Sequence, residues 1–165
     1  MNERERLVAW LGDAFAMETE LLPILRDHSN DAAALPGIRE RIEEHAGETE
    51  QHVERLRQAL GILGNSSPSL KSAVASIVGS IMAPGTAFFS DELVKNGVTD
   101  YAAEQFEVAA YRALVIAAED LGEREVARLC RENLREDEAM AQWLLEQIPI
   151  LVRETLADDM DRARG

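Results

Sequence analysis

The stretch that decides the fold runs from residue 43 to 56 and reads EEHAGETEQHVERL. Glu48 and His52 stand four residues apart, so a helix places them on one face, with His45 one turn before Glu48. A carboxylate on the apolar face of a helix is disfavoured by several kcal/mol unless a cation, a proton or a hydrogen-bond network compensates it. The face is apolar because of four flanking residues at helical spacing, Ile38, Ile42, Leu56 and Leu60.

A carboxylate pair at one fixed offset occurs twice in the chain. Thirty residues separate Glu18 from Glu48, and thirty separate Glu107 from Asp137. The offset between the two pairs is 89 residues. The repeat predicts a helix pair used twice, and two such pairs form a four-helix bundle whose four carboxylates converge at mid-height. This is the layout of a dinuclear metal site.

The rest of the chain favours an all-α fold, because Ala, Leu, Glu and Arg dominate and strand-like alternation is rare. The periodicity predicts a ferritin-like four-helix bundle in which the first helix is bent at Pro23 and the second begins at Pro36. We expect the four long helices to cover about 3–27, 36–60, 99–121 and 123–148.

A long crossover is expected between the second and third helices, since Gly61 and Gly64 end the second one. It should carry short helices over 67–84 and 90–95, the latter closed by Asn96-Gly97. Pro149 should break or restart the last helix. These elements are expected to form one domain over 1–165, with a core at about 3–148 and a helical tail at 149–162.

Composition excludes several classes of function. The net charge is −14 and the pI is about 4.6, which repels phosphate backbones and anionic membranes and leaves no footprint for nucleic acid. The weakly polar stretch 73–89 is interrupted by Pro84 and Gly85, so it does not predict a membrane span. The first residues show no secretory signal, and Cys130 cannot form an internal disulfide, so we expect a cytoplasmic protein.

The candidate metal ligands depart from the usual pattern in two ways. In dinuclear iron or manganese bundles the helix motif is Glu-x-x-His, whereas Glu48 and His52 are four apart. The repeat-mate of His52 is Ala141, which carries no ligand, so the predicted site is asymmetric. A histidine on such a face is also often a hydrogen-bonded core residue. On the fourth helix only Asp137 falls on the apolar stripe, and the acidic residues around it are typical of a solvated surface.

Four segments resemble the bacterial ferritin-like family of unknown function 892 (DUF892), the YciE/YciF-like stress proteins. They are DAFAMETELL at 13–22, EEHAGETEQHVERL at 43–56, EQFEVAAY at 104–111 and LREDE at 134–138. The resemblance implies a rubrerythrin- or ferritin-like bundle, commonly dimeric, with a dinuclear metal site and a link to stress responses. Residue by residue it supports Glu18, Glu48, His52, Glu107 and Asp137 as metal ligands. The chain departs from the family where many members have His instead of Gln105 and Asp instead of Ala141.

Two hypotheses follow. In the first, the protein binds iron or manganese and reacts with oxygen or peroxide, with Glu18 and Glu107 as terminal or bridging carboxylates, Glu48 and Asp137 as the bridging pair, and His52 as the nitrogen ligand. In the second, a metal-free helical bundle acts as a structural or partner-binding stress protein, and a homodimer is expected in either case. Its inward carboxylates are then protonated or paired with Arg and His.

Overall fold

The computed structural model describes residues 1–65 and 91–162, and within these residues it contains four helices and no strand. The all-α prediction is therefore confirmed. The helices are α1 (Glu3–Asp31), α2 (Pro36–Ile62), α4 (Glu92–Asp120) and α5 (Arg124–Arg162).

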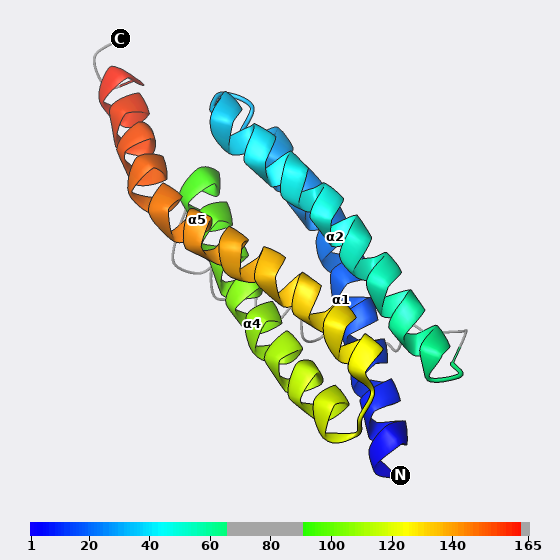
Figure 1. Cartoon of the computed structure of the whole chain (residues 1–165). Coiled ribbons are helices and arrows are strands. Elements are labelled where there is room, and N and C mark those ends of the chain that lie inside the picture. The colour runs from blue at the N-terminus through cyan, green and yellow to red at the C-terminus, as the bar shows by residue number, and fades with distance from the viewer. Residues whose placement is uncertain (66–90, 163–165) are drawn as a thin grey trace.

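The four helices form a bundle in which α1 and α5 run in one direction and α2 and α4 in the other (Figure 1). α1 packs against α2 and α4, and α5 packs against the same two helices. Because α2 and α4 are parallel, α4 begins at the opposite end of the bundle from the end of α2, as the predicted long crossover requires (Figure 1). The short helices predicted over 67–84 lie outside the described residues.

Local sequence signals explain most helix boundaries. Asn2 and Glu5 form a capping box at the start of α1, in which the Asn2 side chain accepts a hydrogen bond from the Glu5 backbone at 2.8 Å. Pro36 occupies the first turn of α2, as predicted. Gly122 adopts φ +75° in the short link between α4 and α5, a conformation that favours glycine.

Three predicted helix ends are wrong, and tertiary packing explains two of them. α1 continues past residue 27 to Asp31, and Ser29 is buried within the extension. The short helix predicted at 90–95 does not end at Asn96-Gly97, because α4 runs through these residues without a break. Gly97 leaves room there for α5: a Cβ added to it would lie 2.5 Å from Leu151 Cδ1. α5 continues through Pro149, and the buried Leu151 holds the following turn against the bundle.

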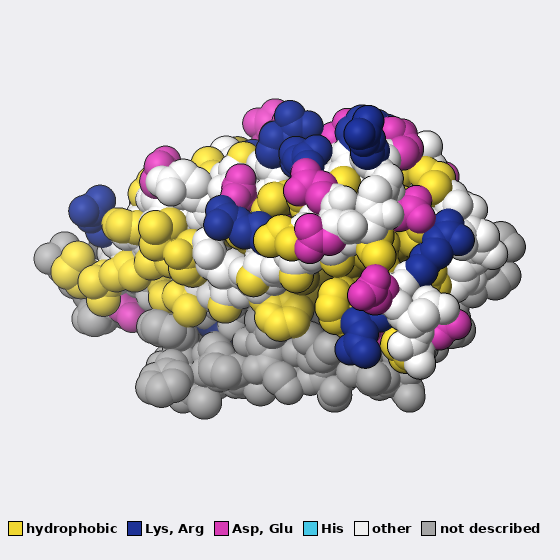
Figure 2. All heavy atoms as spheres, turned by 60° about the horizontal axis from the view of Figure 1, so that its bottom comes forward, with side chains coloured by type: hydrophobic (Ala, Val, Ile, Leu, Met, Phe, Trp, Pro, Cys, Tyr) yellow, Lys and Arg dark blue, Asp and Glu magenta, His cyan; other side chains and the backbone are white. Residues whose placement is uncertain are grey.

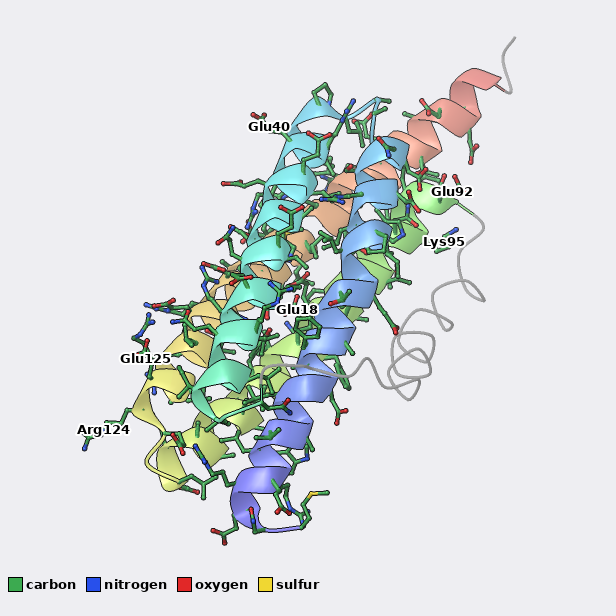
Figure 3. The ribbon with its side chains drawn as sticks, turned by 90° about the vertical axis from the view of Figure 1, so that its right-hand side faces the viewer. Glu18, Glu40, Glu92, Lys95, Arg124 and Glu125 are labelled. Carbon is green, nitrogen blue, oxygen red and sulfur yellow. The ribbon has the colours of Figure 1, made fainter. Side chains whose placement is uncertain are left out.

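Two apolar clusters fill the ends of the bundle and leave a polar layer between them. One cluster includes Leu7, Leu56 and Leu114, and the other includes Ile42, Met140 and Leu144. Glu18 marks the polar layer inside the bundle near mid-height (Figure 3). In the described part of the chain, none of the helices is long and apolar enough to cross a membrane.

Candidate metal centre

The polar layer consists of side chains that are at most 4% exposed, contributed by all four helices. Burying charged groups is costly. It occurs here because the helix faces that form the two apolar clusters also carry acids and histidines in their middle turns, and these turns face the inside of the bundle. The buried members are Glu18, His45, His52, Glu104, Glu107, Tyr111, Asn133 and Asp137.

Two groups of three residues in this layer have ligand atoms close enough together to hold a metal ion. Glu18, His52 and Asp137 form one triad, with all their ligand atoms within 4.8 Å of one another. A second triad of the same dimensions combines His45 and Glu104 with the same Asp137. Asp137 therefore lies between two potential cation positions, as a bridging carboxylate does in a dinuclear centre.

Unpartnered oxygens show that this layer fits a cation. Among the described residues, five buried side-chain oxygens have no hydrogen-bond partner, and four of them belong to the triads. These four are Glu18 Oε2, Glu104 Oε2 and both oxygens of Asp137. A buried polar atom without a partner costs about 1–3 kcal/mol or more, so four together call for a ligand that supplies positive charge. Carboxylate oxygen with imidazole nitrogen is a donor set that suits iron and manganese.

Each histidine connects a buried carboxylate to an outer one. His45 Nε2 lies 2.9 Å from Glu104 Oε1, and its Nδ1 lies 2.7 Å from Glu48 Oε2. His52 repeats this arrangement two turns later on α2: Nδ1 lies 3.2 Å from Glu18 Oε1 and Nε2 lies 2.8 Å from Glu136 Oε2. Because carboxylates face both nitrogens, each ring donates twice and carries a positive charge here.

Arginines anchor the two outer carboxylates. Arg55 Nη1 lies 2.6 Å from Glu136 Oε2, and Arg41 Nη1 lies 3.2 Å from Glu48 Oε2. The side chains of Glu136 and Glu48 are 30% and 27% exposed. The two histidines are thus held in orientation from the rim of the layer, in the manner of the outer carboxylates that orient metal-bound histidines.

The electrostatics of the layer follow from burial opposed by close countercharges. Burial alone would lower the pKa of His45, but the charge of Glu104 and hydrogen bonds to Glu104 and Glu48 raise it to about 10. Burial also raises the pKa values of Glu107 and Asp137 well above their usual range, and the charges of Glu18 and Glu104 add to this shift. The layer therefore holds protons that a metal ion would displace.

Tyr111 fixes the carboxylate of Glu18. Its hydroxyl donates a hydrogen bond to Glu18 Oε1 and accepts one from Asn133 Nδ2 at 2.8 Å. Burial raises the pKa of Tyr111 well above its usual value, so the phenol stays a donor. Its ring also stands edge-on to His52, at 6.1 Å between centroids. Glu18 and His52 are consequently positioned by the same tyrosine.

The structure brings together three of the five predicted ligands, Glu18, His52 and Asp137. Glu107 is buried among the same charges but belongs to neither triad, and Glu48 lies at the rim against His45 and Arg41. The roles of these two as metal ligands stay predictions. Ala141, where the repeat would place a second ligand, is buried without a donor atom.

Three histidine or carboxylate residues of the arrangement were not among the predicted ligands: His45, Glu104 and Glu136. His45 lies seven residues before His52, two helical turns, and Glu104 lies seven before Tyr111, so the same spacing rule could have found both. Glu136 carries no such signal. Its carboxylate is held beside His52 by Arg55 of the neighbouring helix, a contact that the sequence pattern does not reveal.

The raised pKa values predict how the stability of the metal-free protein depends on pH. The pKa of His45 is 6.5 in the unfolded chain and about 10 in the folded one, so the folded state binds more protons between these values. Its contribution is present below pH 6.5 and is lost as the pH rises toward 10. On the acid side, Glu136 has a pKa lowered to about 2, and its contribution is lost as the pH falls from 4.5 toward 2.

We therefore expect the urea midpoint of the metal-free protein to fall steadily from pH 6.5 to pH 10. Chemical unfolding followed by circular dichroism in chelator-treated buffer measures this. A midpoint that rises over the same interval would contradict the protonated layer described above.

Comparison with known proteins identifies relatives over nearly the whole chain. The model of a family described as a domain of unknown function (DUF892) matches residues 2–157. A crystal structure of a protein from Xanthomonas campestris pv. campestris is 36% identical, with a TM-score of 0.82, and the match covers 96% of this chain and 99% of that one.

Two more distant structures share the fold. The stress protein YciF of E. coli is 21% identical with a TM-score of 0.79, over 93% of this chain and 98% of that one. YcfI of Rhodopseudomonas palustris, described as a putative structural protein, is 23% identical with a TM-score of 0.75, over 87% and 93% of the two chains.

Proposed function

The chain belongs to the DUF892 family, whose function is unknown, and from this starting point we propose that it binds two iron or manganese ions in its buried layer and reacts with oxygen or peroxide. The observation that carries the proposal is the pair of triads that share Asp137 and leave four buried carboxylate oxygens without a partner. Hydrogen bonding within the protein does not satisfy these oxygens, and a pair of cations would.

The residues have distinct parts in this proposal. Glu18, His52 and Asp137 would hold one ion, and His45, Glu104 and Asp137 the other. When bound, iron or manganese would supply the electrons that reduce oxygen or peroxide. Glu48 and Glu136 would keep the outer nitrogens of the histidines protonated and oriented, while the apolar clusters keep bulk water out of the layer.

The first test is direct binding. Untagged protein is analysed for iron and manganese, stripped, and titrated anaerobically with Fe(II) before exposure to oxygen. We expect two ions per chain and rapid oxidation of the bound Fe(II). Binding of less than one ion per chain at saturating Fe(II) would contradict the proposal.

Metal binding should release protons. The inner nitrogens, Nε2 of His45 and Nδ1 of His52, have to lose their hydrogens before they can bind a cation. We therefore expect about two protons released per chain from the histidines near pH 7, with more from Glu107 and Asp137. Calorimetric titration with Mn(II) in buffers of different ionisation enthalpy gives this number, and a heat that is independent of the buffer would count against the assignment.

The outer carboxylates give a sharper prediction. Glu136→Gln should weaken Mn(II) binding by about 10- to 100-fold, because His52 loses the acceptor of its outer N–H. Glu48→Gln should act in the same way through His45 and keep the stoichiometry at two. Loss of one ion in Glu48→Gln would instead make Glu48 a direct ligand. Glu54→Gln serves as the control, since Glu54 is an exposed residue of α2 paired with Arg57.

A second candidate function is a metal-free bundle that binds a partner or a second copy. Every ring nitrogen of His45 and His52 already faces a carboxylate, so the layer is largely neutralised without a cation. The C-terminal part of α5 also leaves Leu156 and Met160 more than half exposed, and hydrophobic side chains gather beside this end of the molecule (Figure 2). Homodimerisation through this surface would cover them. A cytoplasmic location and a role in stress belong to both proposals.

A further inference from the structure

Of the residues that the structure describes, Asp100 is the one buried acid that belongs to neither triad and has an oxygen without a hydrogen-bond partner. Its side chain is 3% exposed. Oδ1 lies 2.7 Å from Nδ1 of His28, whereas Oδ2 has no hydrogen-bond partner among the described residues. The hydrogen bond to His28 therefore satisfies only Oδ1, and the buried Oδ2 needs a further ligand.

The unexplained carboxylate borders a small cavity near the start of α4. Its volume is about 20 Å³, enough for one water molecule or one small cation, and the polar side chains that reach its wall are those of Asp100, His28, Asn96 and Gln147. Nonpolar side chains of α2, α4 and α5 form the rest of the wall. The His28 side chain is 12% exposed, so the cavity lies close to solvent.

Asp100 also lies between this cavity and Glu104, a residue of the metal centre, along α4. It stands four residues before Glu104, and hence one turn away on the same face of α4. Glu104 presents the next unpartnered oxygen and binds His45. Two carboxylate oxygens without a hydrogen-bond partner, one at the cavity and one in the second triad, are thus separated by a single turn of α4.

The other approaches to the layer are unfavourable for a cation. Glu48 and Glu136 reach the rim, but Arg41 and Arg55 bind them there, and a guanidinium repels an approaching cation. Beyond Tyr111 the bundle is closed by the apolar cluster that contains Leu7 and Leu114. Near the cavity, the positive charge of Lys95 acts on His28, but the Lys95 side chain points away from the bundle in Figure 3.

We propose that His28 and Asp100 form an access site, where a divalent cation binds transiently before it passes to Glu104. This inference rests on the proposed function, since an access site requires a metal centre that receives the cation. The cation exchanges water for Asp100 Oδ2 and then exchanges Asp100 Oδ2 for Glu104 Oε2. The proton that His28 shares with Asp100 returns to solvent.

An access site has a kinetic signature that a supporting role lacks. Uptake and release follow the same route, so damage to it slows both rates equally and leaves the Kd unchanged. Asp100→Asn suits this test because the pair changes from charged His28 and Asp100 to two neutral groups. The net charge near the metal centre then changes little, since the hydrogen bond and charge of Asp100 are the main causes that raise the pKa of His28 against the effect of burial, with a further contribution from Asp31.

The experiment measures Mn(II) uptake and chelator-driven release by stopped flow, with the Kd from equilibrium titration. We expect both rates to fall by about 10-fold or more in Asp100→Asn, with the Kd within about threefold of the wild-type value. His28→Gln should show the same pattern, and it decides the outcome if Asp100→Asn does not fold. Glu92→Gln is the control, because it removes an exposed acid at the start of the same helix and should leave both rates unchanged.

Rates equal to those of the wild-type protein in folded variants would overturn the access site and leave the metal centre intact. A weaker Kd with faster release would also overturn it, by showing that Asp100 supports the centre instead of feeding it. If the wild-type protein bound no Mn(II), the proposed function would fail, and the access site with it.

Discussion

Replacing Asp137 by Asn should abolish metal binding and, in the same protein, stabilise the metal-free fold. Asp137 belongs to both triads, so its loss should weaken Mn(II) binding by more than about 100-fold at both positions. Neither of its oxygens has a hydrogen-bond partner among the described residues, and Oδ1 is 3.5 Å from Nδ1 of His52. Burial raises the pKa of Asp137 well above its usual range. Removing it should raise the free energy of unfolding in chelator by about 1–3 kcal/mol at pH 8.5.

The gain should be smaller at pH 6 than at pH 8.5, because a carboxyl with a raised pKa binds a proton to a greater extent at the lower pH and then costs less. Urea unfolding at both pH values and equilibrium titration with Mn(II) provide the measurements. Glu138→Gln is the matched control, because the adjacent Glu138 is 41% exposed, paired with Arg112 and expected to affect neither property. A destabilised Asp137→Asn protein would show that this carboxylate supports the fold by itself.

Saturating metal should raise the melting temperature of the wild-type protein strongly. A ligand that binds only the folded state adds about 4 kcal/mol at a free concentration of 1,000 times its Kd. For a chain of this length that corresponds to a shift of roughly 8–16 °C. Calorimetry with Fe(II) under anaerobic conditions, or with Mn(II), measures the shift.

Mg(II) is the control for this experiment, because it prefers an all-oxygen octahedral site and gains little from two imidazoles. It should leave the melting temperature nearly unchanged. Equal shifts with Mg(II) and Mn(II) would indicate screening of the acidic surface of the protein, whose net charge is −14, instead of a specific site.

The fold could be predicted from the sequence because its determinants are local and periodic. Apolar residues at spacings of three and four define the long helices, and Pro36 and Gly122 mark two of their ends correctly. Helix continuity at Gly97 and Pro149 could not be predicted, since it depends on contacts between α4 and α5. Gly97 reads as a helix end in the sequence, whereas in the structure it allows the close approach of Leu151.

The candidate site could be predicted only in part for a related reason. The repeat at 30 residues identified Glu18 and Asp137 because both lie on apolar stripes. The same rule placed Glu48 on the buried face of α2, but the rotation of α2 about its axis brings His45 inside and leaves Glu48 at the rim. Rotation of a helix is set by the packing of all its neighbours, and periodicity fixes it only to within about one residue.

Asp137 is shared by the two triads, and we expect it to lie between two metal ions. Crystals grown with Mn(II) and measured at the manganese absorption edge provide the decisive test. We expect two anomalous peaks per chain, one bound by Glu18, His52 and Asp137 and the other by His45, Glu104 and Asp137. The absence of any peak in this layer at saturating Mn(II), with His45 and His52 still hydrogen-bonded to Glu104 and Glu18, would contradict it.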